Sequence, residues 1–187
     1  MNSAIHILNS TVSPESRLDE IMQTVRSTFP LPVTLGNHSL DLRSTYDSAR
    51  GQYNSTALLS QILASSADDA EKFIAIVDVD LYIPVLTFVF GEAQFDGPAA
   101  VVSTHRLSNE FYGMPADPGA LFHRLEKEVV HELGHTFGLY HCHQFECVMR
   151  SSTYVEEIDL KRITLCPSCL SILQANIRKP FDRTISA

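Results

Sequence analysis

Two histidines and a glutamate in the second half of the chain have the spacing of a metal-dependent hydrolase. His131 and His135 are four residues apart, so on a helix they lie about 40° apart around the axis and one turn apart along it. Both imidazoles can therefore reach a single ion at roughly 2.0–2.1 Å. Glu132 is too far around the helix to coordinate easily, but it can touch a water molecule on the metal. The pattern predicts zinc as the cofactor and Glu132 as the general base of a hydrolysis.

A third metal ligand is expected shortly after this helix. Gly138 lets the chain turn sharply away, and His141, three residues further on, can return to supply a third nitrogen. Three histidines and a water molecule make an open catalytic site and not a closed structural one. Cys142 and His143 are rival third ligands, and the three-residue step from the glycine favours His141. The alternative is a coincidental helix with solvent-facing histidines, which the fixed offsets of the motif argue against.

All four cysteines of the chain follow this segment, in two pairs with four and two intervening residues: Cys142 and Cys147, then Cys166 and Cys169. Two such pairs match a closed tetrahedral zinc site with four thiolate ligands. This site would stabilise a segment that offers little hydrophobic core. The alternatives are two disulfides, four free thiols, or redox chemistry by the second pair at a helix start. We expect the structural zinc site, and therefore two zinc ions per chain.

Length and composition restrict the class of protein and its partners. With 187 residues, of which 44% are hydrophobic and 19% charged, the chain suits one domain. A net charge of -8 gives it no electrostatic reason to bind phosphates, so nucleic acid is not an expected partner. No stretch approaches the ~18 apolar residues of a membrane span, and the N-terminus lacks the features of a signal peptide. We expect a cytoplasmic monomer that acts on peptides or small proteins.

Hydrophobic periodicity predicts alternating strands and helices in the first half of the chain. One helix is expected over residues 14–29, with Ser13 as its N-cap and Pro14 in its first turn, and another over 52–64. Short strands broken by proline and glycine continue into the middle of the chain. The expected strands cover residues 4–8, 32–36, 73–78, 86–90 and 99–103.

The second half is expected to contain one long helix and one short one. After a loop over residues 108–119, Asp117 and Pro118 can open the long helix, and Gly138 is a natural terminator for it. The chain then reads as mostly irregular until a final helix over 167–177. The expected fold class is α+β, with an α/β-type N-terminal half.

The string from His131 to His141, followed by Met149, resembles the metzincin clan of zinc peptidases. The four cysteines narrow the resemblance to the archaemetzincin (archaelysin) family, and weaker similarity over residues 78–107 extends it to most of the chain. The resemblance implies a metzincin-like zincin fold with an active-site helix. It also implies one catalytic domain, residues 1–187, with an N-terminal subdomain of about 1–138 above the cleft and a small, irregular C-terminal subdomain of about 139–187 below it.

The resemblance also implies roles for the motif residues. His131, His135 and His141 would bind the catalytic zinc, Glu132 would be the general base, and the four cysteines would hold the structural zinc. Met149 would pack beneath the three imidazoles without binding the metal, and Gly138 would support the turn. Ser151 stands where certain relatives have an extra tyrosine, two residues after the methionine, so the group that stabilises the oxyanion besides zinc stays open.

The strand near residues 99–104 would form the upper rim of the cleft, where an extended peptide could pair with a free edge; the alternative is an interior strand with no ligand role. Three functions follow from these features. The first is a zinc peptidase, which Glu132 favours because a pure binding module needs no base beside the metal. The alternatives are a catalytically silent, zinc-stabilised peptide-binding module and a zinc hydrolase of a non-peptide amide.

Overall fold

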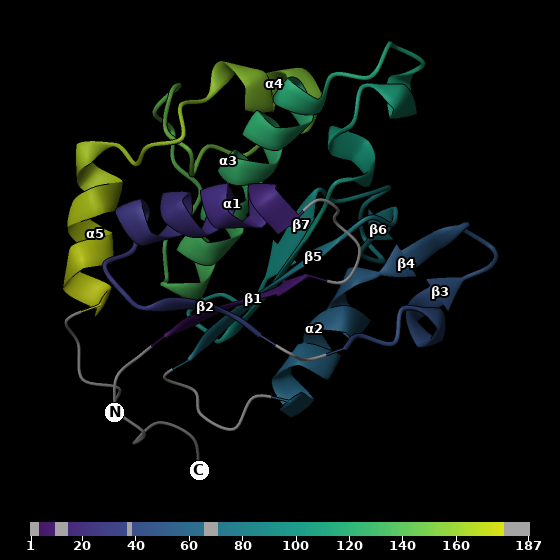
Figure 1. Ribbon diagram of the computed structural model, residues 1–187, viewed down its shortest axis with the longest axis horizontal. Coiled ribbons are helices and arrows are strands. Elements are labelled where there is room, and N and C mark those ends of the chain that lie inside the picture. Colours follow the sequence, from purple (N-terminus) through teal and green to yellow (C-terminus); the bar gives the residue numbers. More distant parts are fainter. Residues whose placement is uncertain (1–3, 10–14, 37–38, 66–70, 178–187) are drawn as a thin grey trace.

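The protein has a mixed α/β architecture in which helices cover both faces of a central sheet (Figure 1). The computed structural model describes residues 4–9, 15–36, 39–65 and 71–177. The helices are α1 (Glu15–Thr28), α2 (Ser55–Ser65), α3 (Pro118–Thr136), α4 (Val155–Leu160) and α5 (Pro167–Ile177). The strands are β1 (Ile5–Asn9), β2 (Val33–Leu35), β3 (Tyr46–Asp47), β4 (Gln52–Asn54), β5 (Lys72–Val77), β6 (Leu81–Tyr82), β7 (Gly91–Ala93) and β8 (Ala99–Ser103).

The central sheet has five strands in the order β2-β1-β5-β8-β7. The first four are parallel, and β7 returns antiparallel to β8, with Glu92 opposite Val101. The prediction that residues 99–104 form a free edge is therefore wrong, because both neighbours of β8 are occupied. β7 is the edge strand on this side of the sheet. A three-stranded sheet of β3, β4 and β6 lies beside it.

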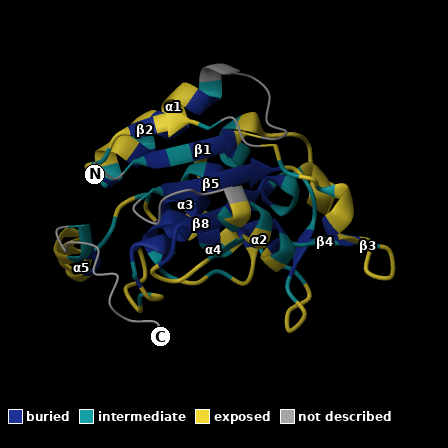
Figure 2. Ribbon diagram, turned by 90° about the horizontal axis from the view of Figure 1, so that it is seen from below, coloured by how far each residue is buried: buried dark blue, intermediate teal, exposed yellow. Residues whose placement is uncertain are grey.

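Alternating residues of the parallel strands divide the hydrophobic core into two layers, because successive side chains of a strand point to opposite faces. Ile74 and Ile76 of β5 belong to the core under α1 and α3, whereas Phe73, Ala75 and Val77 pack with α2 on the other face. β5 and β8 are buried along their whole length, and Figure 2 shows them enclosed by helices. A sheet covered on both faces explains why these strands read as continuous apolar runs.

The expected helices agree well with the structure. The helix predicted over 167–177 is α5, the one opened by Asp117 and Pro118 is α3, and the one predicted over 14–29 is α1; its proposed cap, Ser13 with Pro14, lies outside the described residues. The helix expected over 52–64 begins later, at Ser55. The side chain of Asn54 accepts a hydrogen bond from Ala57 N (3.0 Å), which caps α2 and leaves residues 52–54 free to form β4.

One sequence-based expectation fails and a second is incomplete. Residues 86–90 alternate like a strand, but among them only Val89 forms a single bridge, with Leu81, and the regular strand starts at Gly91. The stretch between α3 and residue 167 is mostly irregular, as predicted, but the sequence did not predict the short helix α4 within it. The carboxylate of Glu157 accepts hydrogen bonds from the backbone N–H groups of Thr153 (2.6 Å) and Tyr154 (3.3 Å), which stabilises the first turn of that helix.

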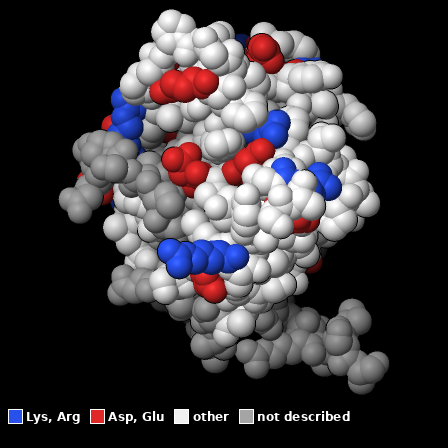
Figure 3. Space-filling model, turned by 90° about the vertical axis from the view of Figure 1, so that its right-hand side faces the viewer, with Lys and Arg blue, Asp and Glu red and all other residues white. Residues whose placement is uncertain are grey.

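Among the described residues, no helix combines the length and the apolar character needed to cross a membrane. On the face shown in Figure 3, the acidic and basic side chains of the described residues are interspersed and form no continuous basic surface.

Candidate active site

The helix α3 carries His131, Glu132 and His135, and its two ends are fixed by local interactions. At the start, the Asp117 side chain accepts a hydrogen bond from Ala120 N (2.9 Å), and Pro118 occupies the first turn. At the end, Gly138 has a φ of 76°, a left-handed conformation that costs glycine little. Its N–H donates to His135 O (2.9 Å), as expected for a glycine that terminates a helix.

The turn at Gly138 brings His141 back beside the helix. One ring nitrogen from each of His131, His135 and His141 lies within 4.8 Å of the others. The ring centroid of His141 is 5.3 Å from that of His131 and 4.9 Å from that of His135. The structure therefore brings together the three imidazoles that the spacing selected. The rivals are not part of this group: Cys142 belongs to the cysteine cluster, and His143 belongs to neither group.

The donor chemistry of two of these histidines fits a cation. The Nδ1 atom of His131 lies 2.8 Å from Val148 O, and that of His135 lies 2.7 Å from Leu139 O. A carbonyl oxygen can only accept, so each Nδ1 carries the proton and each Nε2 presents a lone pair. These two Nε2 atoms are 3.1 Å apart, close to the roughly 3.3 Å expected between two nitrogens that bind one zinc ion tetrahedrally.

A metal ion explains the short distance between the two Nε2 atoms better than a proton shared between the rings does. Burial is the largest cause that lowers the pKa of His131, well below its ordinary value, and that of His135 and His141 as well. Neutral imidazoles with converging lone pairs repel one another unless a cation lies between them. Carbonyl groups that receive the outer N–H of each ring are the usual way in which proteins orient histidine ligands of a metal.

Glu132 lies under the edge strand of the sheet, in a position that depends on a glycine. A Cβ atom at Gly91 would lie 2.7 Å from Glu132 Cγ and 2.8 Å from Glu132 Oε1. Burial, followed by the charge of Glu128, raises the pKa of Glu132 well above its usual range. Glu132 thus lines the same cavity as the three imidazoles, where it and His131 are buried and His141 is exposed. Gly91 was missed from the sequence, because nothing in the pattern shows which strand crosses the helix.

Met149 is completely buried and lies against the active-site helix. A Cβ atom at Gly134 would lie 2.4 Å from Met149 Sδ, so the helix has room for the thioether only because it carries glycine at this position. The carbonyl oxygen of the following residue, Arg150, accepts a hydrogen bond from Lys161 Nζ (3.0 Å). Met149 therefore packs against α3 at Gly134, the residue before His135.

The three histidines and Glu132 line one wall of a cavity of about 450 Å³. The opposite wall is the chain from Ile83 to Phe95, which includes β7, and residues 151–153 close one end. Glu128, one turn before Glu132 on α3, also reaches the cavity. It forms a buried ion pair with Lys161, with 3.0 Å between Oε1 and Nζ. Glu128 could have been found from its four-residue spacing to Glu132, whereas no sequence signal pointed to Lys161.

The four cysteines form a second cluster, in which the Sγ atoms lie within 4.8 Å of one another. None of them is in a disulfide, and the 3.7 Å between Cys142 Sγ and Cys166 Sγ is far above a disulfide bond length. It is close to the roughly 3.8 Å between two thiolates on one tetrahedral zinc ion. Against the effect of burial, hydrogen bonds from Cys169 and the other two cysteines lower the pKa of Cys166 to about 7, while burial raises that of Cys169.

Comparison with known proteins identifies close similarities over most of the chain. The model of peptidase family M54 matches residues 15–175. The archaemetzincin of Natronomonas pharaonis is 41% identical over 153 residues, which cover 80% of this chain and 87% of the relative. A solved archaemetzincin structure from Methanopyrus kandleri superimposes with a TM-score of 0.82 at 32% identity, covering 95% of this chain and 97% of that one. A zinc-dependent peptidase from Methanocorpusculum labreanum gives a TM-score of 0.80 at 32% identity, with coverages of 90% and 99%.

The fold and these matches define a zinc metallopeptidase of the metzincin type, an enzyme that acts on peptide substrates. More specifically, the chain belongs to the archaemetzincins, peptidase family M54.

Proposed function

We propose that this chain hydrolyses peptide bonds at a zinc ion held by His131, His135 and His141, with Glu132 as the general base. The observation that carries the proposal is the convergence of three ring nitrogens within 4.8 Å, two of them oriented by backbone carbonyl groups. Zinc bound by three nitrogen ligands lowers the pKa of a water molecule and polarises a carbonyl group.

The Glu132 carboxylate performs the proton transfers in this proposal. It accepts a proton from the attacking water and delivers it to the leaving amine nitrogen. Its elevated pKa suits that role, because a base that must later act as an acid needs a pKa nearer neutrality than an exposed glutamate has. Gly91 keeps the carboxylate in place by leaving space for it beneath β7.

The edge strand β7 is the proposed binding surface for the peptide backbone. Only one of its sides pairs within the central sheet, with β8, and its residues line the cavity. An extended peptide can add to such an edge through main-chain hydrogen bonds, which leaves alternate side chains for pockets to select. We assign the rim of the cleft to this strand in place of residues 99–104.

The second proposed site is a structural zinc ion held by Cys142, Cys147, Cys166 and Cys169. The cluster joins the loop after α3 to the first turn of α5 (Pro167–Ile177), two segments that are far apart in the sequence. We also propose that residues up to about 138 form an upper subdomain and those from about 139 a lower one, which supplies His141 and residues 151–153 to the lining of the cavity. The proposed enzyme is a cytoplasmic monomer.

Metal analysis combined with a peptide-library digest tests the proposal. The wild-type protein is expected to contain about two zinc ions per chain and to cleave peptides. Glu132→Ala should retain both ions and lose cleavage by a factor of about 10² to 10⁴. Two zinc ions with no cleavage by the wild type would contradict the proposal and favour a peptide-binding module. Cleavage that survives in Glu132→Ala would remove the assigned role of the glutamate.

A further inference from the structure

We propose that the end of the active-site cavity beside Glu128 binds a basic side chain of the substrate, a lysine or an arginine. This inference rests on the proposed peptidase function and adds a specificity-determining residue to it. Glu128 and Glu132 are four residues apart on α3, so they share one helix face. Both line the cavity, and the first lies one turn away from the reacting centre.

The two walls of the cavity run side by side, which defines its two ends. Gly91 lies next to Glu132, and Asp96 N donates a hydrogen bond to His135 O (2.9 Å), so the chain from 91 to 96 follows α3 in the same direction. Residues 88–90 therefore lie toward the turn that carries Glu128. At the other end, the rings of Phe95 and Tyr140 contact each other in a tilted arrangement, with 4.3 Å between their centroids.

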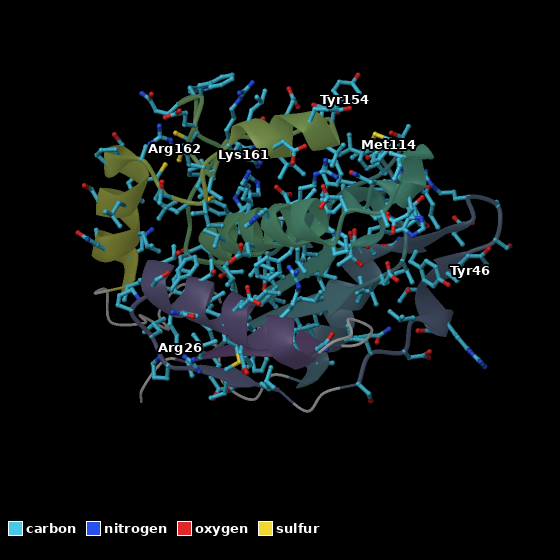
Figure 4. All side chains as sticks on the ribbon, turned by 45° about the horizontal axis from the view of Figure 1, so that its top comes forward. Arg26, Tyr46, Met114, Tyr154, Lys161 and Arg162 are labelled. Carbon is cyan, nitrogen blue, oxygen red and sulfur yellow. The ribbon has the colours of Figure 1, made fainter. Side chains whose placement is uncertain are left out.

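The Glu128 carboxylate is held from behind by Lys161. The side chains of the two residues are 5% and 1% exposed, and Lys161 Nζ also donates to Arg150 O (3.0 Å). Figure 4 shows Lys161 between α4 and α3. An ionised carboxylate can accept about four hydrogen bonds. Within the described residues, the hydrogen bond from Lys161 Nζ to Oε1 therefore leaves the Glu128 carboxylate able to accept others. The ion pair thus orients Glu128 without saturating it.

The end of the cavity beside Glu128 is closed by residues that follow Arg150. Ser151 and Ser152 line it, and the buried Ser152 hydroxyl has no hydrogen-bond partner in the described part of the chain. A buried polar group without a partner is costly, so this hydroxyl is suited to a ligand that brings one. Arg150 precedes these serines, and its carbonyl oxygen accepts a hydrogen bond from Lys161 Nζ, so the serines lie close to the ion pair of Lys161 and Glu128.

The lining favours a side chain with an apolar stem and a cationic head. Phe88 and Phe90 contact each other edge to face, with 5.3 Å between their centroids, and supply an apolar wall. Two lining residues on α3 carry carboxylates (Glu128 and Glu132), the carboxylate of a third, Glu92, accepts hydrogen bonds from Ser55 and Thr56 of α2, and none of the lining residues is lysine or arginine. The methylene stem of a substrate lysine or arginine can pack on the phenylalanines while its head donates to Glu128. A substrate carboxylate at the same position would be repelled.

Peptide binding measured by fluorescence anisotropy tests this inference independently of catalysis. The zinc-loaded Glu132→Gln variant, which should not consume the peptide, is titrated with peptides that carry arginine, citrulline or glutamate at one position, scanned along the sequence. At one position, arginine should bind about tenfold to a hundredfold more tightly than citrulline, and glutamate most weakly. Adding Glu128→Gln should abolish the preference for arginine over citrulline.

Two further variants make the test decisive. Glu146→Gln removes the same charge from an exposed ion pair with Arg162, where the glutamate side chain is 58% exposed, and should leave the preference unchanged. If Glu128→Gln destabilises the fold by leaving Lys161 unpaired, the double variant Glu128→Gln/Lys161→Met removes both buried charges and should still lose the preference.

The outcomes separate this inference from the proposed function. Equal binding of the three peptides at every position, no binding of any peptide, or a preference that survives loss of Glu128 would overturn the basic-residue site. Cleavage by the wild type without any basic preference would overturn it too, while leaving the peptidase function in place. Selective binding of arginine peptides with no cleavage by the wild type would support the site and contradict the peptidase function.

Discussion

The two clusters of metal-binding side chains are built in different ways. The histidine cluster takes two of its members from α3, a long helix with a capped start and a glycine at its end, buried against the sheet. The cysteine cluster takes its members from a loop and from the first turn of α5, and Cys142 and Cys166 are only partly buried. Core packing can therefore position most of the histidine cluster. The cysteine cluster depends instead on the metal ion that we propose between its four sulfur atoms.

The clusters meet at one peptide bond, between His141 and Cys142. The N–H of Cys142 donates to Met149 O (2.9 Å), so the loop that carries the third histidine is tied both to the cysteine cluster and to the methionine beneath the site. The geometry of the histidine cluster should consequently depend on the cysteine cluster more than the reverse. Substitution of a cysteine should weaken zinc binding by the histidines, while substitution of a histidine on α3 should leave zinc binding by the cysteines unchanged.

The largest expected effect comes from removing a histidine on the helix. In His135→Ala, cleavage should fall by at least about three orders of magnitude, because the metal loses one of its three ligands. Zinc content measured by mass spectrometry of the native protein should fall from about two ions per chain to about one. The control is His143→Ala, which should change neither quantity because His143 is outside both clusters. Loss of both ions in His135→Ala would show that the dependence runs in both directions.

Compared with His135→Ala, the Cys166→Ser variant is expected to lose less activity and more thermal stability. Removing one thiolate should weaken the structural site and loosen the loop that holds His141, so zinc content should fall at both sites. The thermal midpoint should fall as well, because metal binding contributes directly to folding in such segments. Zinc titration with a competing chelator measures the two affinities separately. An unchanged affinity at the histidine site would refute the coupling through the bond between His141 and Cys142.

The smallest and most selective change is expected from Gly91→Ala, which should affect the base and neither cluster. The added methyl group would lie 2.7 Å from Glu132 Cγ and 2.7 Å from the backbone oxygen of Val101, so it would shift the carboxylate and the edge strand relative to each other. The value of kcat should therefore fall by about tenfold to a hundredfold while both zinc ions are retained. The control is Gly119→Ala, where a Cβ atom would lie 3.3 Å from Asp117 Oδ1 at the start of α3, away from the cavity. A fall in zinc content equal to the fall in kcat would assign Gly91 to metal binding instead.

The parts of the fold that the sequence predicted are those set by local chemistry. The extent of α3 followed from Asp117, Pro118 and Gly138, which act through their own backbone geometry and hydrogen bonds. The gathering of the imidazoles followed from the four-residue step on a helix and the glycine turn. The gathering of the two cysteine pairs was predictable because pairs at this spacing are typical of a single metal site.

The parts that failed depend on contacts between distant segments. Residues 86–90 have the alternation of a strand, but Leu86 is 51% exposed and Phe88 packs on Arg106 and Phe90, so pairing starts only at Gly91. The order of strands in the sheet places β7 outside β8, which chain order does not determine. The roles of Gly91 and Lys161 became visible only when the edge strand and the chain at the end of α4 were positioned against α3.

An anomalous difference map, collected from crystals of the metal-replete protein at the zinc absorption edge, tests the central claim most directly. It should contain two peaks per chain. One should lie among the four cysteine sulfurs, and the other should be bound by His131, His135 and His141 with its fourth position filled by solvent. A single peak, or a fourth protein side chain on the histidine-bound ion, would contradict the account.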